Sequence, residues 1–158
     1  KEAGVQGFTE PDPKIDLSGV DVARKILILI RESGNAMEME DIINNCFLPD
    51  ECMNTTNNED FFASLIKHSA HFEKLLADTK ANDCRLKFVA SFDNGKASVG
   101  LQQIPKESPF YNLEGKDNIV EFYTDRYIDQ PLIIKGAGAG AAVTASGIFA
   151  DVIRIGNV

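Results

Sequence analysis

GFTEPDPKIDLSGVDVARKILILI, residues 7–30, begins as a loop dense in charge and turns abruptly into a continuous apolar run. Its two prolines disfavour helix, because proline fixes φ and restricts the residue before it, so an extended loop is predicted. A helix capped by Ser18 or Asp16 is predicted next, from about Gly19 to Glu32, where apolar residues recur at helical spacing. A helix that is apolar on most sides is typical of a domain interior.

The composition limits the class of protein. The chain has 158 residues, of which 44% are hydrophobic, and a net charge of −8. These values suit one globular domain and exclude a nucleic-acid partner, which requires a basic face. The longest apolar run, Ile26–Ile30, is too short for a membrane span. Three cysteines without CxxC spacing predict free thiols and a cytoplasmic protein.

The rest of the chain alternates between strand and helix patterns. Asn94-Gly95 between two alternating segments is a strong hairpin signal. An amphipathic helix is predicted from near Asn58, and an apolar helix rich in small residues over 141–155. Strands are predicted over residues 37–49, 84–92, 96–104, 118–127 and 131–136. The inner face of the amphipathic helix is predicted to consist of Phe62, Leu65, Ile66, Phe72, Leu75 and Leu76. This order predicts an α+β fold, an open mixed sheet of four to five strands with helices on one face.

Asp21 and Lys25 are candidate catalytic residues on the first predicted helix. They are four residues apart and share a helix face, where they form either an ordinary surface ion pair or a functional one. Charge beside an apolar helix is costly unless it is paired or used, and Glu10, Asp12 and Asp16 approach the same helix end. Carboxylates bind amino groups and a desolvated lysine can move a proton, so the cluster suits a small ammonium compound.

Metal binding is not predicted anywhere in the chain. The spacing Asp12-x-Lys14-x-Asp16 puts a lysine at a ligand position of a calcium loop. His68 and His71 have the spacing of a metal pair on a helix, but the sequence offers no evident third ligand. Both histidines are therefore expected to be solvated helix residues.

The glycine run KGAGAGAA, residues 135–142, fits the G-x-G-x-x-A form of a dinucleotide fingerprint from Gly136 to Ala141. Only 17 residues follow Ala141, too few for the βα units behind a true fingerprint. Two interpretations stay open. The run is either a turn with close strand–helix packing, or a helix N-terminus that approaches a nucleotide held by another domain.

The segment AGVQGFTEPDPKIDLSGVDVARK resembles the signature of homoserine dehydrogenases. SPFYNLEGKDNIVEFYTDRY and LIIKGAGAGAAVTASGIFADVIRI are similar to the closing strands and final helix of that family, and the middle region is most similar to its bifunctional aspartokinase–homoserine dehydrogenase type. The resemblance implies that Lys25 donates and accepts the proton at the substrate oxygen and that Asp21 orients it. It also implies that Glu10 binds the substrate ammonium group and that Asp16 supports the same pocket.

The resemblance further implies an enzyme that uses NADP or NAD to interconvert L-aspartate 4-semialdehyde and L-homoserine in the biosynthesis of threonine, methionine and isoleucine. Residues 1–135 would form the substrate, catalytic and dimerisation domain. Residues 136–158 would form a turn and helix that return to a nucleotide-binding domain, with Gly138 and Gly140 beside the cofactor. The family's Rossmann half is not among these residues, so the chain alone is expected to be inactive. The expected partners are the substrate and a second copy bound through the sheet; the alternative is a non-catalytic amino-acid-binding or dimerisation module.

Overall fold

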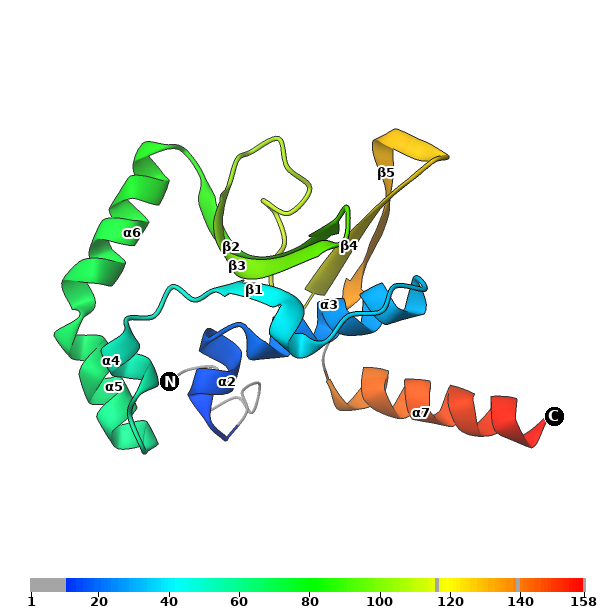
Figure 1. Cartoon of the computed structure of the whole chain (residues 1–158), viewed down its shortest axis with the longest axis horizontal. Coiled ribbons are helices and arrows are strands. Elements are labelled where there is room, and N and C mark those ends of the chain that lie inside the picture. Colours follow the sequence, from blue (N-terminus) through cyan, green and yellow to red (C-terminus); the bar gives the residue numbers. More distant parts are fainter. Residues whose placement is uncertain (1–10, 116, 139, 158) are drawn as a thin grey trace. The chain divides into compact units, whose positions relative to one another are not determined.

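The computed structural model describes residues 11–115, 117–138 and 140–157 (Figure 1). Its mixture of helices and strands confirms the α+β class. The chain forms two compact units that divide between Tyr111 and Asn112, and each is described by itself. The functional boundary expected after residue 135 lies inside the second unit.

Helix α2 (Pro13–Leu17) lies in the segment for which the sequence predicts an extended loop. That prediction is wrong, because Pro13 takes the first helical turn, where its missing N–H is not needed. The Asp12 carboxylate caps the helix by accepting a hydrogen bond of 2.9 Å from the Lys14 amide. The charged segment therefore reaches the next helix through a helical turn of its own.

Helix α3 (Val20–Glu32) matches its predicted bounds to within one residue. Gly19 occupies the N-cap with a φ of 87°, and no side chain caps the helix, so the expected cap by Ser18 or Asp16 is wrong. A Cβ atom on Gly19 would lie 2.7 Å from the Phe88 ring. Glycine is therefore required between α2 and α3 by both the backbone conformation and the available space.

A mixed sheet in the first unit consists of β1 (Ile42–Asn45), β2 (Arg85–Asp93) and β3 (Lys96–Ile104). Strand β3 is central, parallel to β1 and antiparallel to β2. The turn between β2 and β3 confirms the predicted hairpin, because Asn94 and Gly95 take the positive φ values, 47° and 76°, that such turns require. The 3₁₀ turn η1 (Met39–Asp41) precedes β1, which makes this strand shorter than the predicted segment 37–49.

Helix α3 covers one face of this sheet and supplies half of its hydrophobic core. The buried core residues are Ala23, Leu27, Ile30, Ile42, Ala97 and Val99. Phe88, Ala90 and Phe92 of β2 pack against them, as the alternation of the sequence predicts. This packing fixes the axis of α3, and with it the direction of the opposite, solvent-facing side of the helix.

The other face of the sheet carries both polar and apolar side chains. The strand register places Ile43, Val89, Ser91 and Ser98 on it. Ile43 is exposed, and the hydroxyls of the two serines lie 3.1 Å apart. This face therefore combines small, polar and a few apolar side chains.

The first unit also contains the helices α4 (Asp50–Met53), α5 (Asn58–Lys67) and α6 (Ser69–Ala81). Helix α5 begins where it is predicted, but the expected single helix breaks at His68. The predicted inner face is partly wrong: Phe61 is fully buried beside Cys52, whereas Ile66 and Leu76 are largely exposed. The break changes the direction of the chain, so one periodicity cannot describe both helices.

The three cysteines are free thiols, which confirms the prediction. Cys52 is buried in a core that it forms with Leu48 and Phe61, and Cys46 is exposed. The Ser64 hydroxyl contacts the Cys52 sulfur at 3.2 Å. Cys52 therefore acts as a small core residue.

The second unit consists of an antiparallel hairpin, β4 (Asp117–Thr124) and β5 (Tyr127–Ala137), followed by α7 (Ala141–Gly156). The five strands of the described residues thus divide between a three-stranded and a two-stranded sheet, where the sequence predicts one open sheet. Leu132, Ile133 and Ile134 of β5 are exposed, and no described residue of α7 is buried. Among the described residues, no helix is both long and apolar enough to cross a membrane.

Candidate functional site

Asp21 and Lys25 form an ion pair on α3, with 2.7 Å between the Asp21 Oδ2 and Lys25 Nζ atoms. The core-facing residues Ala23, Leu27 and Ile30 fix the rotation of the helix, and this rotation turns the pair away from the sheet. The two side chains are 39% and 55% exposed, so the pair is open to a small molecule. The structure therefore brings together the two residues that the sequence singles out as catalytic.

The geometry of the pair suits proton transfer at a ligand oxygen. An ammonium group has three N–H donors, and one of them suffices for the bond to Asp21. A carboxylate that holds the Lys25 side chain in one position reduces the conformational freedom that the lysine would lose on meeting a ligand. In itself, an exposed pair of this kind contributes little to stability.

Asp16 lies on α2, half-buried, and α2 contacts α3 directly. Ser18, between the two helices, is buried. Its carbonyl oxygen accepts a hydrogen bond of 2.8 Å from the side-chain amide of Asn44. This bond ties the joint between α2 and α3 to strand β1. Helix α2, which carries Asp16, and helix α3, which carries Lys25, are thus joined by a short turn that is fixed to the sheet. Glu10, the expected ammonium ligand, lies outside the described residues.

Two further side chains, those of Lys14 and Asn58, link the segment of α2 to the region of α4 and α5, and the sequence did not indicate either contact. The Lys14 Nζ atom donates to the Thr55 carbonyl at 2.6 Å, and the side-chain amide of Asn58 donates to the Pro11 carbonyl at 2.9 Å. These partners are 41 and 47 residues apart in the sequence, so no local pattern signals either contact. Both bonds join α2 and the residues before it to the turn between α4 and α5.

Gly138 and Gly140 lie in the second unit, before α7. A Cβ atom on Gly138 would collide with the end of the exposed Asn118 side chain, which would have to move. Gly140 is the N-cap of α7, with a φ of 124° that an L side chain rarely adopts. Among the described residues, no side chain caps the N-terminus of α7, and both interpretations of the glycine run stay open.

A cluster of charges joins α4 to the break between α5 and α6. The Glu51 carboxylate accepts hydrogen bonds from Lys67 at 2.7 Å and contacts the His68 ring at 3.1 Å. The hydrogen bond from Lys67, with a further contribution from His68, lowers the pKa of Glu51, and Glu51 in turn raises the pKa of Lys67. His71 is exposed, as expected, although its ring contacts the Phe47 carbonyl at 3.0 Å, whereas the His68 side chain is only 24% exposed. Within the described ranges, no group of three or more His, Cys, Asp or Glu side chains could hold a metal ion.

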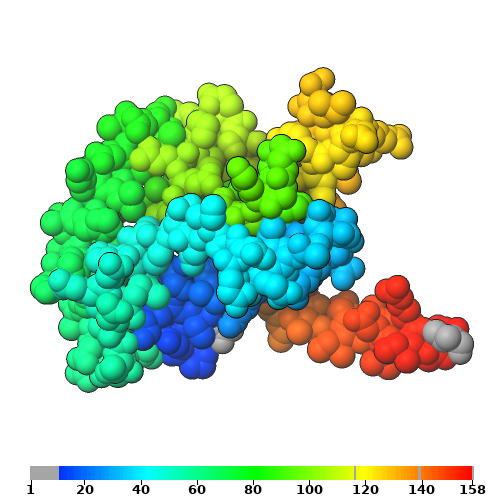
Figure 2. Space-filling view, in the orientation of Figure 1, coloured from blue at the N-terminus to red at the C-terminus, as the bar shows by residue number. Residues whose placement is uncertain are grey.

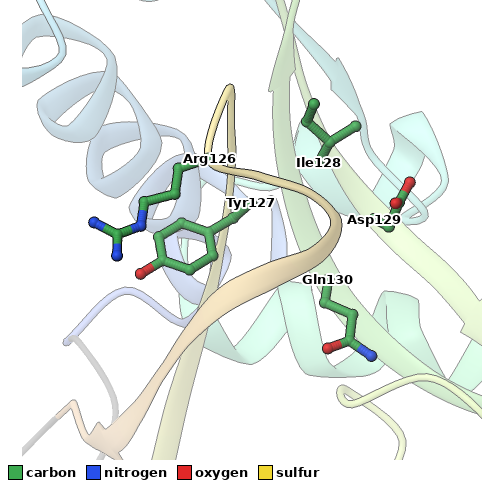
Figure 3. Close-up of a pocket in the computed structure, with 5 residues that line it drawn as sticks. All are labelled: Arg126, Tyr127, Ile128, Asp129 and Gln130. Carbon is green, nitrogen blue, oxygen red and sulfur yellow. The ribbon is translucent and has the colours of Figure 1, made fainter.

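A shallow hollow lies at the turn of the β4–β5 hairpin (Figure 3). It is lined by five consecutive residues, Arg126, Tyr127, Ile128, Asp129 and Gln130. In Figure 3 these side chains spread around the curled strand and do not converge on one point. None of the described site residues that the sequence predicts lines it.

Comparison with known proteins identifies the family. Residues 1–153 match the family model described as homoserine dehydrogenase. The chloroplastic bifunctional aspartokinase/homoserine dehydrogenase 2 of Arabidopsis thaliana is 44% identical over 158 residues, which cover 99% of this chain and 17% of that protein. This chain therefore spans about a sixth of that relative.

Two solved structures have the same fold. A protein of unknown function from Candida auris is 36% identical, with a TM-score of 0.87 over 99% of this chain and 44% of its own. The homoserine dehydrogenase of S. aureus, at 22% identity, has a TM-score of 0.68 over 98% of this chain and 35% of its own. The match to the family model and the Arabidopsis relative agree with this fold, and the chain belongs to the homoserine dehydrogenase family.

Proposed function

We propose that the longer protein to which this chain belongs interconverts L-homoserine and L-aspartate 4-semialdehyde with NAD or NADP, and that this chain carries the substrate site. The observation that carries the proposal is the Asp21–Lys25 pair, 2.7 Å apart and open to a ligand on the solvent-facing side of α3. It stands within the segment that matches the family. A module that only binds or dimerises has no need of a lysine held in this way.

Lys25 handles the proton in this proposal. In the direction of reduction, the Lys25 ammonium group donates a proton to the aldehyde oxygen, and the neutral amine takes a proton from the hydroxyl group in the reverse direction. Asp21 holds the lysine in position. NADH or NADPH, when bound, would supply a hydride to the carbon that carries this oxygen, and NAD or NADP would receive it in the reverse direction. Glu10 binds the ammonium group of the substrate, and Asp16 supports the same pocket.

The α7 N-terminus is the part of this chain that fits a nucleotide. Gly140 has no side chain and no described side chain caps the first turn of α7, and uncapped N–H groups at a helix N-terminus attract phosphate. Gly138 allows the chain to approach closely just before that point. In the family's arrangement, the larger share of the nucleotide site would come from a domain outside these residues. The choice between NAD and NADP depends on that domain.

Homoserine oxidation by the purified longer protein tests the proposal. We expect homoserine-dependent reduction of NAD or NADP by the longer protein and none by the 158-residue chain alone. In the longer protein, Glu10→Gln should raise KM for homoserine and leave KM for the nucleotide near its original value, because the lost contact is made only to the amino acid. No homoserine oxidation by the longer protein would contradict the proposal.

A homodimer that forms through the sheet is also part of the proposal. The supporting features are the exposed Ile43 on the open face of the first sheet and the exposed β5 residues Leu132, Ile133 and Ile134. Uncovered apolar residues and strand edges in a small domain are commonly hidden by a partner, here burying more than about 1,000 Å². Sedimentation of the chain at micromolar concentration should give a dimer; a monomer of 17.3 kDa would contradict it.

A further inference from the structure

Residues 11–17, the segment that contains α2, contact the helical layer, which consists of α4, α5 and α6, at three separate points. Lys14 donates from its side chain to the Thr55 carbonyl, and Asn58 donates to the Pro11 carbonyl. Leu17, at the end of α2, packs against the core formed by Leu48, Cys52 and Phe61. Figure 2 shows the dark blue atoms of this segment directly against the teal atoms of α4 and α5.

The two hydrogen bonds reach residues that lie close together in the sequence, Thr55 and Asn58. Thr55 lies in the turn between α4 and α5, and its hydroxyl donates to the Cys52 carbonyl at 2.9 Å. Asn58 is the first residue of α5, whose N-cap Asn57 accepts a hydrogen bond from the Asp60 amide at 2.8 Å. The Lys14 tether therefore ends on the Thr55 carbonyl, in a turn held by a local hydrogen bond, and the Asn58 tether starts from a side chain at the capped N-terminus of α5. Both can thus fix the position of the segment that they bind.

The opposite end of the same segment is fixed to the sheet. The Asn44 amide holds the Ser18 carbonyl, and Gly19 packs against Phe88 where α3 begins. Helix α2, with Asp16, is thus held between the helical layer and the sheet layer. If the tethers to the helical layer were lost, α2 could pivot about Gly19 while Lys25 stayed in place on α3.

We infer that Lys14 and Asn58 are positioning residues that hold the carboxylate-bearing segment in register with Lys25, so that the helical layer α4–α6 sets the affinity for the amino-acid substrate. This inference rests on the proposed function. Lys14 itself is half-buried, and its ammonium group donates to a backbone carbonyl. It therefore acts through the placement of its neighbours. Asp16 is one of these neighbours, and Glu10 immediately precedes the tethered Pro11 in the sequence.

The test uses the longer protein and steady-state kinetics of homoserine oxidation. Lys14→Met keeps the length and apolar stem of the side chain and removes the donor. Asn58→Asp also removes the donor, and a carboxylate in the first turn of a helix does not weaken α5. Either variant should raise KM for homoserine about tenfold, because a hydrogen bond that orders the site is lost, with KM for the nucleotide unchanged and kcat altered less than about threefold.

Two controls separate positioning from general damage. Lys14→Arg can still reach the Thr55 carbonyl and should restore most of the affinity for homoserine. Lys74→Ala removes an exposed lysine from α6 and should leave every kinetic parameter unchanged. Hydrogen exchange of a peptide that covers residues 11–18 provides a readout that needs no substrate, and it should be faster in Lys14→Met and Asn58→Asp than in the original protein.

The outcomes distinguish this inference from the proposed function. If the original protein does not oxidise homoserine, the proposed function is overturned, and faster exchange of residues 11–18 still supports the tethers. If the original protein is active and KM for homoserine is unchanged in both variants, the positioning inference alone is overturned. If Lys14→Met does not fold, Asn58→Asp, which changes an exposed side chain, decides the question.

Discussion

Helices α3 and α7 are both rich in apolar residues, yet among the described residues only α3 contributes to a hydrophobic core. Ile30 of α3 is 1% exposed against the sheet, whereas Ile153 of α7 is 49% exposed. In α3 the apolar residues find strand partners in the same unit, and the opposite face is left free to carry Asp21 and Lys25. A hydrophobic pattern in a helix therefore identifies a face that needs a packing partner, but it does not specify where in the protein that partner lies.

The largest effect on this comparison should come from matched truncations in the two helices. In the 158-residue chain, we expect Ile30→Ala to lower the free energy of unfolding by about 2–5 kcal/mol, because it leaves a cavity in the core. Ile153→Ala should lower it by less than about 0.5 kcal/mol, as an exposed substitution does. Urea unfolding measures both, and equal losses would contradict the contrast between the helices.

A second, smaller effect concerns the joint that carries α3. Gly19 and Gly34 both have a φ of 87°, but a Cβ atom on Gly19 would meet the Phe88 ring, while no atom lies within 4 Å of one on Gly34. Gly34→Ala should therefore cost only the backbone strain, about 1–2 kcal/mol. Gly19→Ala should cost that strain and, in addition, about 1–3 kcal/mol for the crowding. Thermal unfolding of the two variants measures the difference, and equal midpoints would show that the ring yields freely.

The smallest effect is a dependence of stability on pH at Glu51. Its pKa is lowered below the ordinary value of 4.5, chiefly by the hydrogen bond from Lys67. The stabilisation is therefore present above that value and is lost as the pH falls through the lower pKa of the folded state. The fall in the unfolding midpoint between about pH 6 and pH 3 should be slightly smaller in Glu51→Gln than in the original chain. The same fall in both chains would show that this exposed cluster contributes nothing.

Local features of the sequence predict most of the elements correctly. The β2–β3 hairpin follows from Asn94 and Gly95, because few other residues accept positive φ. Helix α3 follows from its spacing of apolar residues. Helix α2 was missed because Pro13 was read as a helix breaker, although proline after a capping Asp12 is a favourable start.

Features that depend on distant parts of the chain could not be predicted. The division of the strands between two sheets depends on pairing partners, which no single strand pattern specifies. In the candidate site, the Asp21–Lys25 pair was predicted because both residues lie on one helix. The contacts of Lys14 and Asn58 were not, because each joins a side chain to a backbone carbonyl more than 40 residues away.

The most direct test of the account is kcat for homoserine oxidation by the longer protein and its Lys25→Ala variant. Arg24→Ala, which removes the neighbouring exposed cation on α3, is the matched control and should keep kcat near its original value. We expect Lys25→Ala to lower kcat by about 10²–10⁴-fold, the usual contribution of a general acid–base. A loss of less than about tenfold in Lys25→Ala would contradict the assignment of proton transfer to this residue.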